Sequence, residues 1–193
     1  MATESSWVDW MIPRLQEALQ GSSTSTMHTV VVSGERLAYR HVVLSYKDAK
    51  PSAAIPSGYE TDILVRDELG DGRWVPRVVI ECKLDSFTTH DAITYSAKAD
   101  THKEVHPYLR YGILIGNHGE KGVPQRLFRH GGSFDFMAAW SAEKPSDNEW
   151  NRLINVLRME IEASRLIEEL VARRQASGGK YSLVHRPLVL TKL

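Results

Sequence analysis

Two carboxylates and a lysine lie at a spacing that could do chemistry on a phosphate ester. The run Val79–Lys83 reads Val-Ile-Glu-Cys-Lys. Side chains alternate along a strand, so Glu81 and Lys83 would project from one face and Cys82 from the other. Asp62 lies in the preceding β-rich run, which a loop with a Gly-Asp-Gly turn separates from the first. If the two strands pair as a hairpin, Asp62 lies across from Glu81.

This arrangement predicts a site for a hard divalent cation. Two neighbouring carboxylates repel each other unless a cation lies between them, and carboxylate oxygens and water are the ligands that Mg²⁺ prefers. An ammonium beside them could place a water molecule or offset the charge of a phosphate in the transition state. Spacing alone leaves a second interpretation open, a structural ion pair between Glu81 and Lys83 on the protein surface.

The elements that must position these residues follow from hydrophobic periodicity and turn signals. Apolar residues at helical spacing predict a first helix over Trp7–Gln20, which Pro13 either kinks or delays. The β-rich runs Met27–Val32 and Leu37–Tyr46 flank a plausible hairpin turn. We expect Lys47–Gly58 to be a loop, because it holds two prolines and a glycine.

The rest of the chain predicts a mixed sheet with helices packed on it. Each further element is expected from a local pattern, in chain order a strand over Tyr59–Arg66, a strand over Val75–Leu84, a helix from Thr88 to about Val105, a short strand over Tyr111–Gly116 and a strand over Phe134–Ala139. A capping box at Ser146 and Glu149 then begins a long C-terminal helix that Gly178-Gly179 ends. The fold class is therefore α/β, with one domain over residues 1–193.

The strings Gly-Tyr-Glu-Thr-Asp-Ile-Leu-Val at residues 58–65 and Val-Val-Ile-Glu-Cys-Lys-Leu at residues 78–84 resemble the signature of the PD-(D/E)xK nuclease superfamily. That group includes restriction endonucleases, Holliday-junction resolvases and repair nucleases, and it shares an α-β-β-β-α-β core. The resemblance covers about residues 7–116, with Met27–Val32 as an additional strand. Residues 117–193 would add a strand, the long helix and a tail. Thr61 stands where the motif's name has proline, which is a frequent variation.

The resemblance implies a metal-dependent endonuclease that cuts DNA, of restriction or other defence type. Asp62 and Glu81 would hold Mg²⁺, or Mn²⁺ in its place, together with the backbone carbonyl of Cys82. Lys83 would orient or activate the attacking water, and in-line attack would leave a 5′-phosphate and a 3′-hydroxyl. Many members also place an acidic residue of the first helix near the metal. Glu17 is the candidate, because it is the only Glu in the predicted helix, although an exposed helix charge is an equal alternative.

Contacts to a nucleic-acid backbone would come from side chains beyond the motif. The helix after it and the acid-free segment further along offer six candidates, which are Tyr95, Lys98, Lys103, Lys121, Arg126 and Arg129. A solvated surface charge is the alternative interpretation of each lysine and arginine. The formal net charge of zero counts against nucleic-acid binding, but local asymmetry matters more than the total, since residues 173–193 hold five Lys or Arg and no acid. A surface that faces a phosphate backbone and plain solvated charge are equal alternatives for this segment.

Two other functional classes stay open at this point. A nuclease-like fold can serve as a non-catalytic nucleic-acid-binding or assembly module, and the same fold can cut RNA instead of DNA. Enzymes that cut both strands of a duplex often work as homodimers. The long C-terminal helix offers an interface for one, so we expect a homodimer.

Two histidines form a weaker metal signal. His102 and His106 are four residues apart and would share one helix face. The zinc motif HExxH needs a Glu directly after the first His, but Lys103 stands there, and Pro107 ends the helix. We therefore expect surface histidines at both positions.

The cellular compartment is expected to be the cytoplasm. A single cysteine excludes an intrachain disulfide and fits a reducing environment. The first residues lack the pattern of a secretory signal, and no apolar run approaches the ~20 residues that span a bilayer, so no membrane partner is expected.

Overall fold

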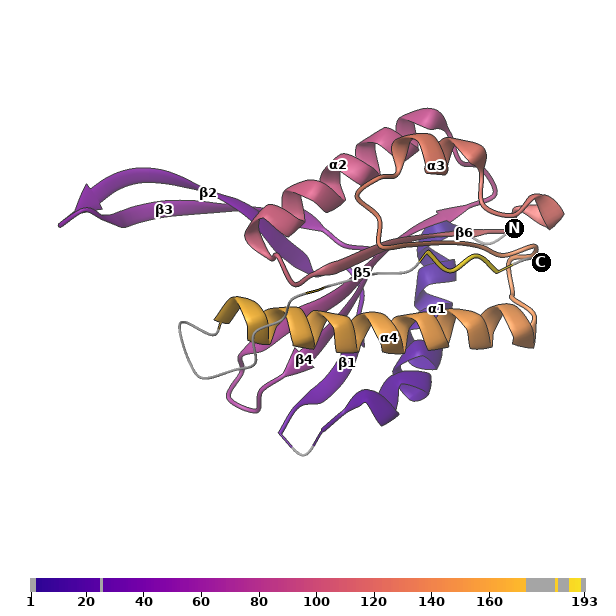
Figure 1. The fold of residues 1–193 in the computed structure, drawn as a ribbon, viewed down its shortest axis with the longest axis horizontal. Coiled ribbons are helices and arrows are strands. Elements are labelled where there is room, and N and C mark those ends of the chain that lie inside the picture. The colour runs from indigo at the N-terminus through magenta and orange to yellow at the C-terminus, as the bar shows by residue number, and fades with distance from the viewer. Residues whose placement is uncertain (1–2, 25, 173–182, 184–187, 192–193) are drawn as a thin grey trace.

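The computed structural model describes residues 3–24, 26–172, 183 and 188–191. In chain order the elements are α1 (Glu4–Leu19), η1 (Gln20–Ser22), β1 (His28–Val32), β2 (Arg36–Lys47), β3 (Lys50–Glu60), β4 (Ile63–Glu68), β5 (Trp74–Leu84), α2 (Thr89–Val105), β6 (Arg110–Gly116), η2 (Gly119–Lys121), α3 (Gln125–His130), β7 (Phe136–Ala139) and α4 (Asp147–Ala172). Within these residues, five strands form one mixed sheet in the order β1-β4-β5-β6-β7, and β2 and β3 form a separate hairpin (Figure 1).

The direction of the strands changes at β5. Strands β1, β4 and β5 pair antiparallel, whereas β5, β6 and β7 pair parallel. Helix α2 supplies the crossover from β5 to β6, which a parallel pair requires. The predicted α/β class with a central mixed sheet and a long last helix is confirmed.

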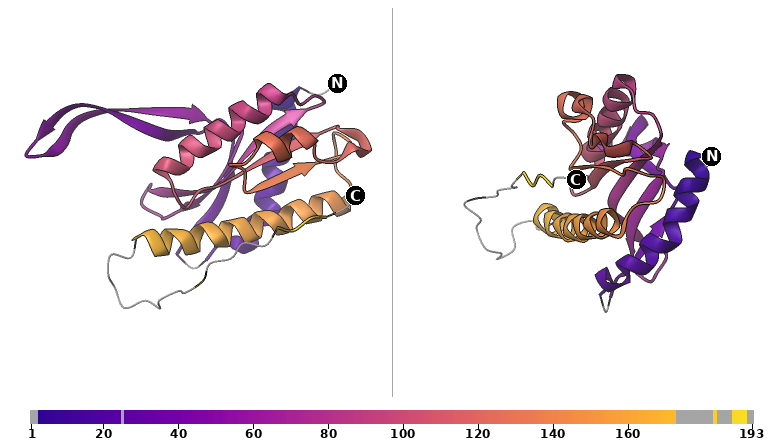
Figure 2. Two further views of the ribbon diagram at one scale, coloured as in Figure 1. Left: turned by 45° about the horizontal axis from the view of Figure 1, so that its top comes forward. Right: turned by 90° about the vertical axis from the view of Figure 1, so that its right-hand side faces the viewer.

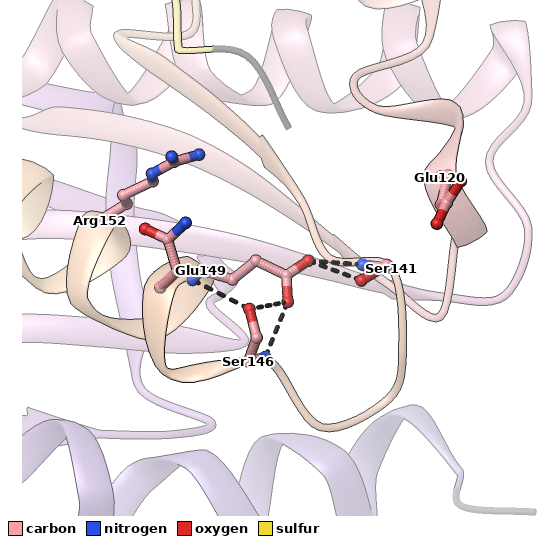
Figure 3. Close-up of a pocket in the computed structure, with 6 residues that line it drawn as sticks. Glu120, Ser141, Ser146, Glu149 and Arg152 are labelled. Carbon is pink, nitrogen blue, oxygen red and sulfur yellow. Dashed lines mark hydrogen bonds between the residues drawn. The ribbon is translucent and has the colours of Figure 1, made fainter.

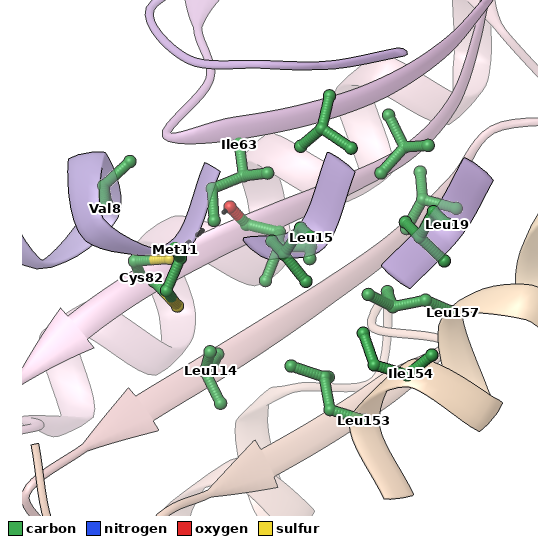
Figure 4. Packing of buried hydrophobic residues seen from close by; sticks show 14 of the residues in the cluster. Val8, Met11, Leu15, Leu19, Ile63, Cys82, Leu114, Leu153, Ile154 and Leu157 are labelled. Atoms are coloured by element: carbon green, nitrogen blue, oxygen red, sulfur yellow. Dashed lines mark hydrogen bonds between the residues drawn. The ribbon is translucent and has the colours of Figure 1, made fainter. Parts of the chain in front are cut away.

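Each face of the sheet carries its own apolar core, because side chains alternate along the strands. Ile63, Cys82 and Leu114 face helices α1 and α4 (Figure 4). The alternate residues Leu64 and Val79 face α2 and α3. Helices α1 and α4 thus cover one face and α2 and α3 the other (Figures 1 and 2).

Helix α1 begins earlier than the sequence pattern predicted. Thr3 is its N-cap and forms a capping box with Ser6, so Ser6 is the third helical residue rather than the cap. Pro13 lies inside the helix and does not end it. The buried Trp7 and Leu15, on either side of the proline, hold both halves against the sheet.

The predicted hairpin between the first two strands is wrong. Strand β1 pairs with β4 across the sheet, with Val31 opposite Val65. Strand β2 instead pairs with β3, which covers most of the segment predicted as a loop. Pro51 and Pro56 are tolerated in β3 because each strand of a two-stranded ribbon has one unpaired edge, where a missing N–H loses no bond. Strand β1 is therefore a member of the central sheet, and the β2–β3 ribbon is the insertion.

A buried ionic network fastens α4 to the strands. The Asp67 carboxylate is fully buried and accepts hydrogen bonds from Arg77 Nε at 2.7 Å, Arg165 Nη2 at 2.8 Å and the Thr29 hydroxyl at 3.0 Å. Arg77 also pairs with Glu168 at 2.6 Å. Because two arginines share one carboxylate that is shielded from solvent, this network fixes the register of α4 on the sheet.

Most other local predictions are confirmed, but the predicted strand over Tyr59–Arg66 is wrong as one element, because β3 ends at Glu60 and β4 begins at Ile63. Helix α2 has Thr88 as its N-cap, and Glu149 forms a capping box with Ser146 at the start of α4. The short helix α3 was not predicted. The predicted helix end at Gly178-Gly179, and all but five residues of the basic stretch 173–193, lie outside the described residues. Among the helices described, none is both long and apolar enough to cross a membrane.

Candidate active site

Asp62 lies directly before β4 and next to the end of β5. Ile63 pairs with Ile80, so the antiparallel register places Asp62 across from Glu81. Asp62 Oδ2 accepts a hydrogen bond from the backbone N–H of Cys82 at 2.8 Å. Strand β4 begins only at Ile63, so it offers no backbone carbonyl opposite Cys82. The Asp62 side chain accepts the Cys82 N–H instead. The two carboxylates therefore lie side by side, on the sheet face that α2 covers.

Glu81 is a buried carboxylate with defined partners. Its side chain is 1% exposed, Lys98 Nζ of α2 lies 2.7 Å from Oε1, and the Tyr111 hydroxyl donates to the same oxygen at 2.5 Å. Burial raises the pKa of Glu81, the negative charge of Asp62 raises it further, and Lys98 opposes both effects. Ionisation of Glu81 therefore costs free energy in this environment, and a bound cation would offset that cost.

Lys83 lies at the rim of the same face. Its Nζ is 3.3 Å from Glu4 Oε1 and 5.2 Å from the centre of the Tyr95 ring. Burial acts to lower the pKa of Lys83, but the Tyr95 hydroxyl and the Glu4 carboxylate outweigh it, so the pKa is raised above its ordinary value. Lys83 is therefore an ammonium at neutral pH and cannot take a proton from water.

The acidic residue of the first helix that reaches this site is Glu4, not Glu17. Glu4 Oε2 accepts from the backbone N–H of Leu84 at 3.3 Å, while Oε1 contacts Lys83. Glu17 is exposed and lies thirteen residues further along α1, about 20 Å at ~1.5 Å per residue. Glu4 was missed because the predicted helix began only at Trp7. The pair of Thr3 and Ser6 is the capping signal that could have revealed it.

Three candidate phosphate contacts on α2 are turned toward the protein. Lys98 Nζ contacts Glu81 and also donates to the carbonyl of Glu60 at 2.6 Å. Lys103 Nζ lies 2.9 Å from Asp135. Tyr95 is half-buried beside Lys83. Both lysines pair with carboxylates that have almost no exposure to solvent, and phosphate contacts by Tyr95, Lys98 and Lys103 stay a prediction.

The three candidates beyond β6 lie apart from this cluster. Lys121 ends η2, and Arg126 and Arg129 belong to α3, and all three are exposed. Arg126 Nη1 donates to the carbonyl of Phe87 at 2.8 Å. A backbone contact by these side chains stays a prediction.

The backbone of Cys82 contacts the candidate site, whereas its side chain does not. The N–H bonds Asp62 at the site, while the thiol is buried in the opposite core, where burial raises its pKa well above the ordinary value. The thiol is therefore a neutral packing group. Metal ligation by the Cys82 carbonyl stays a prediction.

The two helix histidines are anchoring residues, and His102 is not at the surface. His102 is completely buried, and its Nε2 lies 3.0 Å from the carbonyl of Leu37. His106 Nε2 lies 3.0 Å from the carbonyl of Ala38. Carbonyls only accept, so both rings donate there. Helix α2 thereby holds the base of β2.

A polar pocket lies at the start of α4, apart from Asp62, Glu81 and Lys83. It is lined by Glu120, Ser141, Ser146, Asn148, Glu149 and Arg152 (Figure 3). The Glu149 carboxylate accepts hydrogen bonds from the backbone and hydroxyl of both Ser141 and Ser146, at 2.8 to 2.9 Å. These bonds lower the pKa of Glu149 against the effect of burial, so the carboxylate serves as a helix cap.

Within the part of the chain that the structure describes, no three His, Cys, Asp or Glu side chains are grouped to hold a metal ion. Asp62 and Glu81 are the two carboxylates that the strand register brings together at this site, and Glu4 instead contacts Lys83. No known protein family matches the sequence, and no curated protein is detectably similar to it.

Proposed function

We propose that this protein is a Mg²⁺-dependent endonuclease that hydrolyses phosphodiester bonds in DNA. One observation carries the proposal: Asp62, directly before β4, lies across from Glu81 of β5, and Lys83 follows two residues later on the same face of β5. A carboxylate pair with one member fully buried is unfavourable without further positive charge. Such a pair can bind a cation, and the cation can in turn bind a phosphate group of the substrate.

The residues present fit Mg²⁺ or Mn²⁺ better than a metal held by protein ligands alone. Mg²⁺ is usually bound through one or two carboxylates, with water and substrate phosphate as its other ligands. Lys98 and Tyr111 both contact Oε1 of Glu81, and Cys82 contacts Oδ2 of Asp62. Glu81 Oε2 and Asp62 Oδ1 are the oxygens available to a cation. When bound, the ion supplies positive charge that offsets the charge of the phosphate oxygens.

The protein side chains have separate tasks in this proposal. Lys83, as an ammonium, donates to a phosphate oxygen or to the attacking water and does not act as a base. Glu4 fixes the Lys83 side chain at the end of β5. Lys98 and Tyr111 hold the Glu81 carboxylate in one orientation. This division narrows the role expected for Lys83 from water activation to orientation and charge stabilisation.

One observation favours a second candidate function, a non-catalytic nucleic-acid-binding or assembly module. Lys98 lies 2.7 Å from Glu81 and itself supplies positive charge to that carboxylate. Calorimetric titration with Mn²⁺ separates the two functions. Binding that Glu81→Gln abolishes supports the nuclease, and no binding by the unmodified protein supports the module.

The direct test is cleavage of supercoiled plasmid, single-stranded DNA and RNA, each with Mg²⁺, Mn²⁺ or EDTA. We expect metal-dependent cleavage of DNA that is lost in Asp62→Asn, Glu81→Gln and Lys83→Met and kept in the matched control Glu17→Gln. Cleavage of RNA alone would make the protein a ribonuclease. Full activity in any of the three site variants would end the proposal.

Cutting both strands of a duplex would use two such sites, so we also propose a homodimer. Helix α4 leaves Met159 and Leu166 exposed on its outer side, where a second copy could pack. Light scattering on a size-exclusion column measures the mass directly. A monomer at micromolar concentration would remove this part of the proposal.

A further inference from the structure

The β2–β3 ribbon, residues 36–60, extends away from the body of the protein and is called the arm (Figures 1 and 2). All its residues from Arg40 to Pro56 are exposed. Twelve residues of β2 span about 40 Å at ~3.3 Å per residue. The arm is therefore long enough to reach well beyond the sheet that carries Asp62 and Glu81.

The root of the arm is attached to the candidate active site. Helix α2 holds it through His102 and His106, which bond the carbonyls of Leu37 and Ala38. Lys98 joins the two structures directly, because its Nζ contacts both the Glu60 carbonyl at the root and the Glu81 carboxylate. The direction of the arm is thus set relative to Glu81.

The aromatic residues of the root add to this attachment. Tyr39 and Tyr59 stack with ring centroids 4.1 Å apart, and Tyr59 lies edge-on to His102. A pocket lined by Tyr59, Glu60, Ile93, Thr94, Ala97, Lys98 and Thr101 continues from the root along the outer side of α2. A ligand that lies along the arm toward its root reaches Lys98, the residue in contact with Glu81.

The arm carries uncompensated positive charge. Residues 36–60 hold four Lys or Arg and two acids, in a protein whose total is balanced at 24 of each. Arg36, Arg40, Lys47 and Lys50 make no ion pair with any described carboxylate, whereas Lys83, the buried arginines and the inward lysines of α2 are all paired. Unpaired cations on a projecting ribbon attract a polyanion.

The arm also leaves apolar side chains uncovered. Leu44, Tyr46 and Ile55 are 61%, 67% and 53% exposed. Ile55 pairs directly with Val42, so these two project from the same face. A two-stranded ribbon alone is marginally stable in water, and a partner that covers it adds stability. If the arm of a second copy were the partner, the positive charges of the two arms would repel each other. A polyanion as the partner would not cause this repulsion.

We propose that the arm binds duplex DNA by lying in the major groove. That groove is about 12 Å wide and admits a two-stranded β-ribbon. Lys and Arg at the edges of the ribbon contact phosphates of the flanking strands, and the apolar side chains contact base edges such as thymine methyl groups. The inference rests on the proposed function for the cleavage step after binding, and it names duplex DNA as the form of the substrate.

The test measures binding in EDTA, where a metal-dependent enzyme does not cut. A fluorescent 30-base-pair duplex and its single strand are titrated with the full-length protein at several salt concentrations. The arm variant carries Arg40→Gln, Lys47→Gln and Lys50→Gln. If all three contact phosphates, the salt dependence of the binding constant falls by about 2.7 in logarithmic slope. We expect at least ~10-fold weaker duplex binding at 100 mM salt.

A matched control removes the same charge elsewhere. Arg14→Gln, Arg73→Gln and Lys144→Gln change three exposed cations outside the arm. The control should bind as the unmodified protein does. Equal affinity of the arm variant and the control would overturn the proposal, as would tighter binding of the single strand than of the duplex.

The apolar side chains provide an independent readout. Leu44→Ser with Tyr46→Ser should weaken duplex binding without a change in molecular mass. If instead this variant converts a dimer to a monomer and keeps its DNA affinity, the arm holds a second copy and the proposal is wrong. Arm-dependent duplex binding without cleavage in Mg²⁺ would uphold the arm and reject the nuclease. Cleavage at the same rate by the arm variant and the unmodified protein would uphold the nuclease and reject the arm as the DNA-binding element.

Discussion

The Asp62 carboxylate accepts a hydrogen bond from the backbone N–H of Cys82 at 2.8 Å, and this bond ties the start of β4 to the end of β5. The contact places one oxygen of Asp62 in a structural role and holds the side chain next to Glu81. Removing the side chain would therefore disturb the strand pairing as well as the charge. An amide keeps the hydrogen-bond acceptor and removes only the charge.

Asp62→Asn is accordingly the most informative change at the site. We expect a melting temperature close to that of the unmodified protein, because the amide oxygen still accepts from Cys82. DNA cleavage should fall by at least ~100-fold, the scale of losing one main source of charge stabilisation. Plasmid nicking and thermal unfolding measured on the same preparation check both parts. Nicking at the normal rate with an intact fold would contradict the assignment.

Glu4 and Glu17 form a matched pair on one helix. Glu4→Gln removes the carboxylate that holds Lys83 and should reduce cleavage by about 10- to 100-fold, as changes behind an active side chain usually do. Glu17→Gln changes an exposed carboxylate far from the site and should leave the rate unaltered. Initial rates at saturating Mg²⁺ compare the two. Equal rates for both variants would show that Glu4 has no part in the site.

Lys98 should control the pH dependence of cleavage. Its positive charge lowers the pKa of Glu81, so Lys98→Met raises that pKa. The ionised form of Glu81 is the one that binds a cation, and the acid limb of the pH–rate profile should therefore move to higher pH. Lys98→Arg keeps the charge and should return the limb toward its original position. A profile that is unmoved in Lys98→Met would rule out electrostatic control by this lysine.

His102 should make the fold sensitive to acid. Burial lowers the pKa of His102 from 6.5 to about 4, and nearby Lys98 and His106 act in the same direction. The unfolded chain takes up the proton first, so the contribution of His102 is complete above pH 6.5. It is lost as the pH falls from 6.5 to 4, by at most ~3 kcal/mol.

Urea unfolding between pH 7.5 and 4 measures this loss. His102→Gln can still donate to the Leu37 carbonyl but does not titrate, so the slope of stability against pH should flatten. His90→Gln changes an exposed histidine on the same helix and serves as the control. An unchanged slope in the His102 variant would refute this role for its protonation.

The network around Asp67 should dominate the attachment of α4. Asp67→Ala leaves Arg77 and Arg165 without their shared carboxylate, and Arg77 has a nearly buried side chain. Removing one partner of a buried pair typically costs about 3–5 kcal/mol. Asp71→Ala is the control: it removes an exposed carboxylate that pairs with Arg73 in the turn between β4 and β5, and it should change stability little. Chemical denaturation of both variants decides whether burial accounts for the difference.

The sequence by itself determined the features that depend on neighbouring residues. The capping residues Thr88 and Ser146 lie within one turn of the helices they start, so the starts of α2 and α4 could be predicted. Strand alternation likewise predicted that Glu81 and Lys83 share a face and that the Cys82 thiol points into the opposite core.

Only the tertiary structure decided which distant segments meet. Strand β1 could have paired with β2 by a short turn, but burying Val31 against β4 in the central sheet was the more favourable use of that strand. The same holds for the site, because Glu4 and Lys98 reach it from two helices on opposite faces of the sheet. Contacts of this kind depend on how whole faces pack, and no local pattern of residues encodes them.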